Sequence, residues 1–181
     1  MLDRPYNSVI GLYSRLGDTE TARNLLNEYH RSVPEGQRKA SMFQLTAFFG
    51  EAELAAAEGN YDSAADLYAG IKDMGCIYCS VYRSAEMHER AGRSDEALSL
   101  YTTASDMALG TDFITSAPLK PLAYLRLGEI YSEHGELNAA IEAYINFVDL
   151  WSGADDSLQD QVRYARNRVD QLLKQAAREP Q

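Results

Sequence analysis

Two cysteines separated by two residues are, by type and spacing, the pair in this sequence best suited to chemistry. Cys76 and Cys79 could carry out thiol–disulfide exchange if a helix N-terminus lowered a thiol pKa. A thioredoxin-type site also requires alternating strands and helices, which the sequence pattern does not show. A zinc site would need a second ligand pair, and His88 lies nine residues along the same predicted helix. The favoured interpretation is that the two cysteines are small residues packed where helices meet. Redox activity stays open as an alternative.

The remaining catalytic residue types show no motif. His30, His88 and His134 are spread along the chain, and none has a nucleophile or carboxylate at motif spacing. The glycines are scattered, so no phosphate-binding loop is expected. The sequence therefore predicts a protein that is not an enzyme, with no metal site and no cofactor.

Composition describes a folded and acidic chain. Of its 181 residues 45% are hydrophobic and 24% charged, and the formal net charge is −10. Such a charge repels phosphate groups, so we expect neither nucleic acid nor a membrane as partner. No apolar run approaches the roughly 20 residues that span a bilayer. With two cysteines and no leader-like start, cytoplasm is the default compartment; an extracytoplasmic location stays open if the chain is a fragment of a larger protein.

Four glycines that recur along the chain indicate where its helices begin and end. Each follows one helical apolar pattern and precedes another, where a left-handed residue can end a helix and reverse the chain. The four are Gly17, Gly59, Gly92 and Gly135.

Residues around these glycines fall into register. Positions five, nine and twelve after each glycine share one face of a helix. The position at plus five is always alanine, small enough for two helices to approach closely; these are Ala22, Ala64, Ala97 and Ala140. The position at plus nine is always large, and the residues are Leu26, Tyr68, Tyr101 and Tyr144.

This pattern resembles the tetratricopeptide repeat (TPR) family, a helix–turn–helix of about 34 residues. The fourth unit carries it best, from Tyr124 through Gly128 to Tyr131, and the first keeps a closing proline, Pro34. The glycine spacings of 42, 33 and 43 depart from the family period, so an irregular superhelix is expected, with extra residues around 35–40 and 106–117.

The resemblance predicts an all-α fold, a right-handed α-solenoid of about four antiparallel helix pairs in a single domain over residues 1–181. A final amphipathic stretch has the polar outer face of a terminal capping helix. The expected units are residues 4–34, 37–73, 76–109 and 118–150, with a capping helix at 154–177.

In this family the first helix of each pair lines a concave surface at fixed offsets before the turn glycine. Those offsets select a partner-binding groove with aromatic and leucine anchors and an acidic middle. Its principal residues are Asn7, Arg15, Phe49, Glu53, Tyr82, Glu86, Glu89, Arg90, Leu125, Glu129 and Glu133, and further members are Arg4, Ser14, Thr46, Cys79, Leu122 and Ser132.

The resemblance thus implies a non-catalytic module that binds a protein or peptide. Because five glutamates and three arginines occupy the selected positions, a basic or amphipathic segment is the expected partner. The sequence leaves open whether these charges instead only solvate an unused face, and it leaves the oligomeric state open.

A weaker resemblance concerns the context of the chain. The segment from Tyr144 to Trp151 and the helix after it look like the C-terminal end of repeat regions in large bacterial proteins, including kinases and transcriptional regulators. No kinase motif occurs in the chain itself. A sensor or regulatory segment of such a protein is therefore an alternative to a free-standing scaffold.

Overall fold

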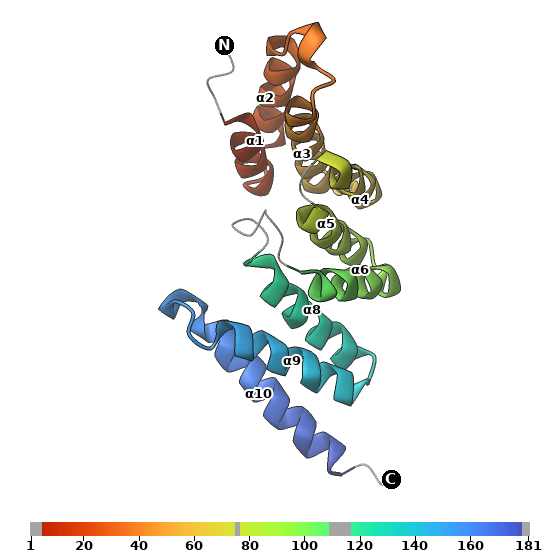
Figure 1. Ribbon diagram of the computed structural model, residues 1–181, viewed down its shortest axis with the longest axis vertical. Helices are drawn as coiled ribbons and strands as arrows, with labels where there is room; N and C mark the ends of the chain where they lie inside the picture. The colour runs from red at the N-terminus through yellow and green to blue at the C-terminus, as the bar shows by residue number, and fades with distance from the viewer. Residues whose placement is uncertain (1–4, 75–76, 109–116, 179–181) are drawn as a thin grey trace. The chain divides into compact units, whose positions relative to one another are not determined.

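The computed structural model describes residues 5–74, 77–108 and 117–178, and every regular element in these ranges is helical (Figure 1). The contacts divide the chain into two compact units, which are described separately. Unit 1 comprises Met1–Ala97 and unit 2 comprises Leu98–Gln181. Helix α6 (Ser94–Asp106) begins in the first and continues into the second.

Unit 1 is built from helices that pack against their neighbours in sequence. Helix α1 packs on α2 and α3, and α4 packs on α3 and α5. Two short 3-10 turns, Glu35–Gln37 and Ile71–Met74, follow α2 and α4. The helices are α1 (Tyr6–Arg15), α2 (Thr19–Ser32), α3 (Ser41–Ala57), α4 (Tyr61–Gly70) and α5 (Ile77–Arg90).

Unit 2 contains one helix pair and the predicted capping helix. Helices α8 (Leu119–Glu133) and α9 (Leu137–Trp151) pack together, and α10 (Gln159–Ala176) covers α9. The apolar stripe predicted for the last helix is correct, because Val162, Ala165 and Leu172 are at most 3% exposed.

All four predicted turn glycines have the expected backbone. Gly17, Gly59, Gly92 and Gly135 have φ between +75° and +79°. In each turn the N–H after the glycine donates to the carbonyl four residues before the glycine, as from Asp18 to Tyr13 at 3.0 Å. These bonds satisfy carbonyls at the helix end, which would otherwise lack a partner. An L side chain is strained at such φ values, so the turns require glycine.

The register predicted from the sequence is confirmed by burial. The alanine five residues after each turn glycine is 0% exposed in every case. The large residue at plus nine is buried in each of the four repeats as well, from Leu26 at 7% to Tyr101 and Tyr144 at 0%. An all-α solenoid of antiparallel helix pairs is therefore the fold class within the described ranges, as the pattern predicts.

The helix boundaries differ from the predicted ones where the repeat spacing is irregular. The second helix pair is expected to start at residue 37, but the chain makes a 3-10 turn at Glu35–Gln37 and α3 begins at Ser41. The final helix begins at Gln159 after a 3-10 turn at Asp156–Leu158. The second expected insertion, at 106–117, lies mostly outside the described residues.

Candidate functional site

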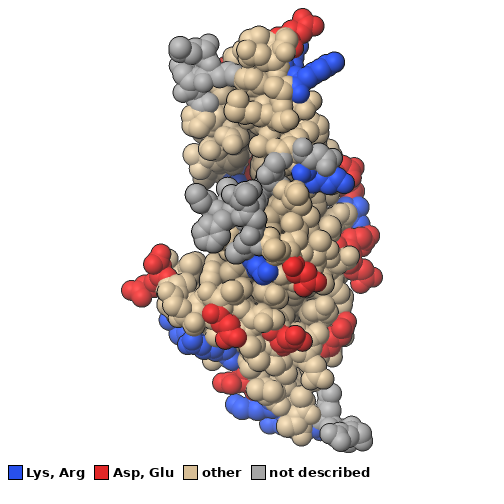
Figure 2. Space-filling view, in the orientation of Figure 1, with Lys and Arg blue, Asp and Glu red and all other residues tan. Residues whose placement is uncertain are grey.

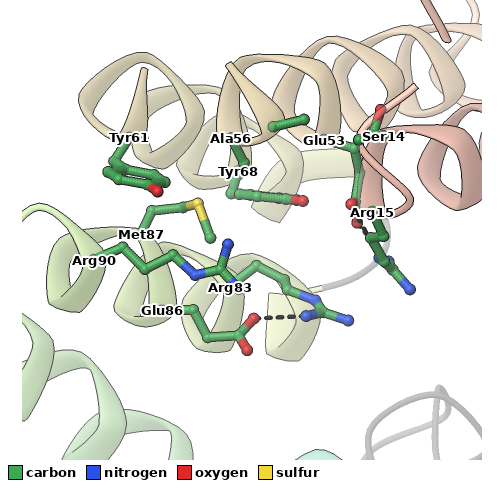
Figure 3. A pocket seen from close by; sticks show the side chains of 12 residues that line it. Ser14, Arg15, Glu53, Ala56, Tyr61, Tyr68, Arg83, Glu86, Met87 and Arg90 are labelled. Carbon is green, nitrogen blue, oxygen red and sulfur yellow. Dashed lines mark hydrogen bonds and ion pairs between the residues drawn. The ribbon is translucent and has the colours of Figure 1, made fainter. Parts of the chain in front are cut away.

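A cavity of about 500 Å³ opens among the helices of unit 1 (Figure 3). Its walls come from the end of α1, from α3 and α4, and from one face of α5. Three arginines, two glutamates, two tyrosines and one serine supply its polar side chains. The lining residues are Ser14, Arg15, Gly17, Glu53, Ala56, Ala57, Tyr61, Tyr68, Arg83, Glu86, Met87 and Arg90.

Glu53 forms one wall as a buried carboxylate. Only 8% of the residue is exposed, and it lies against Gly11, where an added Cβ would be 3.6 Å from its Cδ. Arg15, one turn after Gly11 on α1, donates two hydrogen bonds to it, from Nη2 at 2.5 Å and from Nε at 3.1 Å. The hydrogen bond to Glu53 raises the pKa of Arg15. This two-point contact joins α1 to α3 and compensates the buried charge.

A second ion pair lies on α5. Arg83 donates from Nη1 to Glu86 Oε2 at 2.6 Å, between residues three apart on the helix. Burial opposes the charge on Arg83, but the attraction of Glu86 outweighs it and raises the pKa of Arg83. Tyr68 from α4 lies between the two pairs, and burial raises the pKa of its phenol. Tyr68 is thus a neutral hydroxyl at the base of a charged cavity.

Arg90 is the charged residue of this cavity without a partner among the described residues. Arg15 and Arg83 each bind a glutamate, whereas Arg90 makes no ion pair or hydrogen bond in the described ranges (Figure 3). The lining side chains therefore carry one more positive than negative charge. The face drawn in Figure 2 shows charges of both signs over each unit, without one large field of a single sign. The positive character is local to the cavity in a chain of net charge −10.

Unit 2 has a cavity of its own, of about 300 Å³, between α8, α9 and α10. Its charges balance, because two arginines and two glutamates line it. Burial raises the pKa of Glu129, which pairs with Arg126 three residues before it. The lining residues are Arg126, Glu129, Ser132, Glu133, Tyr144, Tyr164 and Arg168.

Comparison with family models matches two separate parts of the chain. A PPR repeat model matches residues 4–32, and a tetratricopeptide repeat model matches residues 80–112. Both matches fall on helix pairs that meet at a left-handed glycine, Gly17 in one and Gly92 in the other. The chain contains tetratricopeptide-like helical repeats. Comparison with curated proteins gave no match, and comparison with solved structures gave none either.

TPR-like and PPR repeats are generally scaffolds that bind proteins or RNA, and they are typically not catalytic. The two matches support an interaction role for this chain at that level. The exclusion of nucleic acid depends on net charge alone and stays a prediction. None of the helices in the described ranges is long and apolar enough to cross a membrane.

The residues selected by the TPR offsets divide between the two cavities and positions outside them. Glu53, Glu86 and Arg90 line the cavity of unit 1 together with Arg15 and Ser14. In unit 2 the offsets find Glu129, Ser132 and Glu133. Asn7 and Glu89 line neither cavity, and the same holds for Thr46, Cys79 and Leu122. Arg4 lies outside the described residues.

Two of the three expected apolar anchors of the groove are core residues. Tyr82 is 4% exposed and Leu125 is 9% exposed, so neither offers a surface to a ligand. Phe49 is half-buried and packs edge-on against Tyr68, with ring centroids 5.8 Å apart. Neighbouring helices cover Tyr82 and Leu125, so these two are not accessible anchors, whereas Phe49 keeps part of its surface and stays a predicted anchor. The unit 1 cavity is also not acidic, because Arg83 adds a positive charge that the offsets do not select.

The residues considered first for chemistry line neither of the two cavities. Cys79 is disulfide-bonded and half-buried against the core of unit 1, while Cys76 lies outside the described residues. His30 Nε2 lies 3.3 Å from Glu51, and His134 caps the end of α8. No group of three or more His, Cys, Asp or Glu in the described residues could hold a metal ion.

Sequence reasoning missed Arg83, Tyr68, Tyr164 and Arg168 as cavity residues. Tyr68 occupies the large plus-nine position of its repeat, and only 2% of the residue is exposed. Arg83 had one available signal, the i, i+3 spacing to Glu86, which favours an ion pair on a helix face. For Tyr164 and Arg168 no sequence signal was available, because a polar outer face on a capping helix does not show which side chains reach a cavity.

Proposed function

We propose that this chain is a protein-interaction module whose unit 1 cavity binds an extended peptide segment through an acidic side chain. One observation carries the proposal. The cavity holds three arginines, of which Arg90 has no partner among the described residues. An anionic group of a ligand would bind there and balance the remaining charge of the cavity.

The charge of the cavity changes the partner expected from the sequence. Glu53 and Glu86 contribute little attraction for a basic segment, because Arg15 and Arg83 already neutralise them. The guanidinium group suits a carboxylate because its N–H groups match both oxygens. A peptide with an Asp or Glu side chain flanked by neutral residues is therefore the proposed ligand. The same site would serve a free-standing scaffold and a regulatory segment of a larger protein.

The size of the cavity limits what enters it. A volume of about 500 Å³ lies within the range of small-molecule pockets and is enough for two or three side chains. Apolar surface from Ala56 and Ala57 lies beside the charged groups, so an apolar neighbour of the acidic residue would contribute contact area. We expect modest affinity, because one anchor in an open cavity offsets only part of the entropy lost on binding.

The experiment compares ligand charge on the full chain by fluorescence anisotropy. Four labelled probes of equal length are titrated: a peptide with a central Asp-Glu pair, the same peptide with Lys-Lys, its Asn-Gln analogue, and a single-stranded RNA. We expect the acidic peptide to bind most tightly. Replacing Arg90 by Gln should weaken it about tenfold, the effect of losing a charged hydrogen bond.

Arg31→Gln is the matched control, because Arg31 is an exposed arginine of the same unit, on α2 and outside the cavity. That variant should bind the acidic peptide like the original protein. Preferred binding of the Lys-Lys peptide, or equal losses in the two variants, would refute the proposed ligand. Tightest binding of the RNA, sensitive to Arg90→Gln, would assign the cavity to phosphate groups instead.

A further inference from the structure

Helix α1 carries a row of apolar side chains on a face turned away from the core of unit 1. The row has the spacing i, i+4, i+7 and i+11, which places its members along one side of a helix. The residues that form this α1 stripe are Pro5, Val9, Leu12 and Leu16. Leu12 is 55% exposed and Leu16 is 71% exposed, Pro5 is exposed as well, and Val9 is half-buried. A different side of α1, with Tyr6, Ile10 and Ser14, is the buried one.

The α1 stripe has a counterpart on α3, the first helix of the next pair. The stripe lies twelve, eight, five and one residues before its turn glycine, and the residues at these offsets before Gly59 are Ala47, Glu51, Leu54 and Glu58. Glu51 lies 3.3 Å from His30 Nε2 on α2, and Glu58 pairs with Arg23 on the same helix. Ala47 and Leu54 pack in the core cluster to which α1 and α2 contribute most residues. All four positions thus contact the preceding helix pair.

Helix α5 uses the same offsets against α4. Ser84 donates its hydroxyl hydrogen to Ala65 O at 3.1 Å, and Ser80 donates to Ala69 O at 3.4 Å; both carbonyls belong to α4. Met87 is 4% exposed in a cluster that contains α4 residues. On α3 and α5 this face therefore binds the preceding pair, whereas no helix in the described ranges covers it on α1. In unit 2 the residues at these offsets are also at most 4% exposed on α8: Ala123, Leu127 and Ile130.

The chemistry of the α1 stripe differs from that of its counterpart on α3. Where α3 has Glu51 and Glu58, which face basic residues of α2, α1 has Val9 and Leu16. These two side chains offer no charge to a partner and are stabilised by removal from water. A helix that covers α1 must therefore carry apolar residues where α2 carries basic ones.

A second copy of the chain does not offer such a helix at α10. The outward face of α10 is polar, with Arg163, Arg166 and Asp170 exposed. Its exposed large apolar residues, Tyr164 and Leu173, are nine residues apart and so lie on opposite sides of the helix. Two α1 stripes packed on each other would bury only four side chains per copy, far less than the roughly 800 Å² per partner of a stable interface.

We propose that the α1 stripe binds an amphipathic helix of a partner protein, which packs on α1 as α2 packs on α3. The partner helix carries an uninterrupted apolar row at i, i+3 or i+4, and i+7, and has a polar outer face. We expect modest affinity, with a Kd on the order of 100 µM for an isolated helix, because only four side chains are buried. None of the four lines the unit 1 cavity, so this site goes beyond the proposed function and does not depend on it.

The test uses α2 itself as the template for a probe. One labelled peptide has the sequence of residues 18–33, and a second differs only by Arg23→Leu and His30→Leu, which complete its apolar row. Both are titrated with the full chain by fluorescence anisotropy. We expect the substituted peptide to bind at least tenfold more tightly, because its leucines meet Val9 and Leu16. Equal affinities of the two peptides, or no binding of either, would overturn the proposal.

Leu12→Gln in the full chain locates the binding site. This exposed side chain contributes little to folding, so we expect an unchanged Tm together with about tenfold weaker binding of the substituted peptide. Leu173→Gln is the matched control, because Leu173 is a leucine of similar exposure, 51%, on a helix outside the proposed site. The control should bind the peptide like the original chain. Equal affinities of the two variants, or a Tm lowered in Leu12→Gln alone, would contradict the proposal.

Sedimentation velocity separates a partner helix from a second copy. We expect the original chain and Leu12→Gln to sediment alike over the same concentrations. Self-association of the original chain that Leu12→Gln abolishes would assign the α1 stripe to a second copy and overturn the partner helix. The acidic ligand of the unit 1 cavity is tested separately, since its binding depends on Arg90 and should be the same in Leu12→Gln as in the original chain.

Discussion

Replacing Gly128 by alanine tests the packing of unit 2 at its closest approach. A Cβ added to Gly128 on α8 would lie 2.8 Å from two ring atoms of Tyr144 and 2.9 Å from a third. Side chains do not tolerate carbon contacts that short. The Tyr144 ring is 0% exposed, so it cannot move into solvent to relieve them. The helices would have to separate or the ring would have to leave its preferred rotamer.

Two opposing effects set the size of the change. Overpacking a well-packed core costs about 1–3 kcal/mol, whereas alanine is about 1 kcal/mol better than glycine inside a helix. The net expectation for Gly128→Ala is a loss of about 1–2 kcal/mol in the free energy of unfolding. For a chain of this size each 1 kcal/mol lowers Tm by about 2–4 °C.

Gly11→Ala is the matched control, because Gly11 is also a buried glycine inside a helix. The nearest atoms to its added Cβ, the Cγ and Cδ of Glu53, are both at 3.6 Å, an ordinary contact. Gly11→Ala should therefore stabilise the protein by about 0.5–1 kcal/mol. Guanidinium and thermal unfolding of the full chain measure both variants. If Gly128→Ala stabilises as much as Gly11→Ala, the placement of Tyr144 against α8 is wrong.

Three further substitutions test other parts of the account. Ala140→Trp, at a position that is 0% exposed, should destabilise by about 1–3 kcal/mol or more, and unchanged melting would disprove the repeat register. Arg15→Met should destabilise by leaving the Glu53 carboxylate buried and unpaired, and adding Glu53→Gln should recover part of the loss; a double variant less stable than the single one would refute the pairing. Burial raises the pKa of Glu129 above 4.5, so the folded state keeps a proton that the unfolded chain releases. The free energy of unfolding should therefore fall as the pH rises from the pKa of Glu129 in the unfolded chain to its higher pKa in the folded state. Glu129→Gln should remove this part of the fall, as measured by urea unfolding between pH 4 and pH 7. Identical pH profiles for the variant and the original chain would contradict this assignment.

The repeat framework could be predicted from the sequence because it depends on local requirements. A left-handed turn needs glycine, and a close helix approach needs alanine, so Gly135 and Ala140 mark a helix pair without any tertiary information. The start of α3 at Ser41 was not accessible, because the 3-10 turn before it interrupts the helical pattern. Boundaries that depend on such turns are set by packing as well as by residue preference.

The candidate sites could be predicted from the sequence only in part, for a different physical reason. Family offsets select positions on one helix face, but burial depends on the neighbouring helix, which covers Tyr82 and Leu125. The charge of a cavity depends on where long side chains end. The backbone position of Arg83 does not predict that its guanidinium group lines the unit 1 cavity. The contribution of Tyr164 comes from the covering helix α10, whose rotation about its axis the sequence pattern does not specify.

Charge reversal at Arg90 tests the central claim, that the unit 1 cavity binds a peptide through an acidic side chain, most directly. The measurement is the Kd of two peptides, identical except for a central Glu or Lys, for the original chain and for Arg90→Glu. The variant should lose affinity for the Glu peptide and gain affinity for the Lys peptide. If each peptide binds both proteins with the same Kd, Arg90 does not contact the ligand and the claim is wrong.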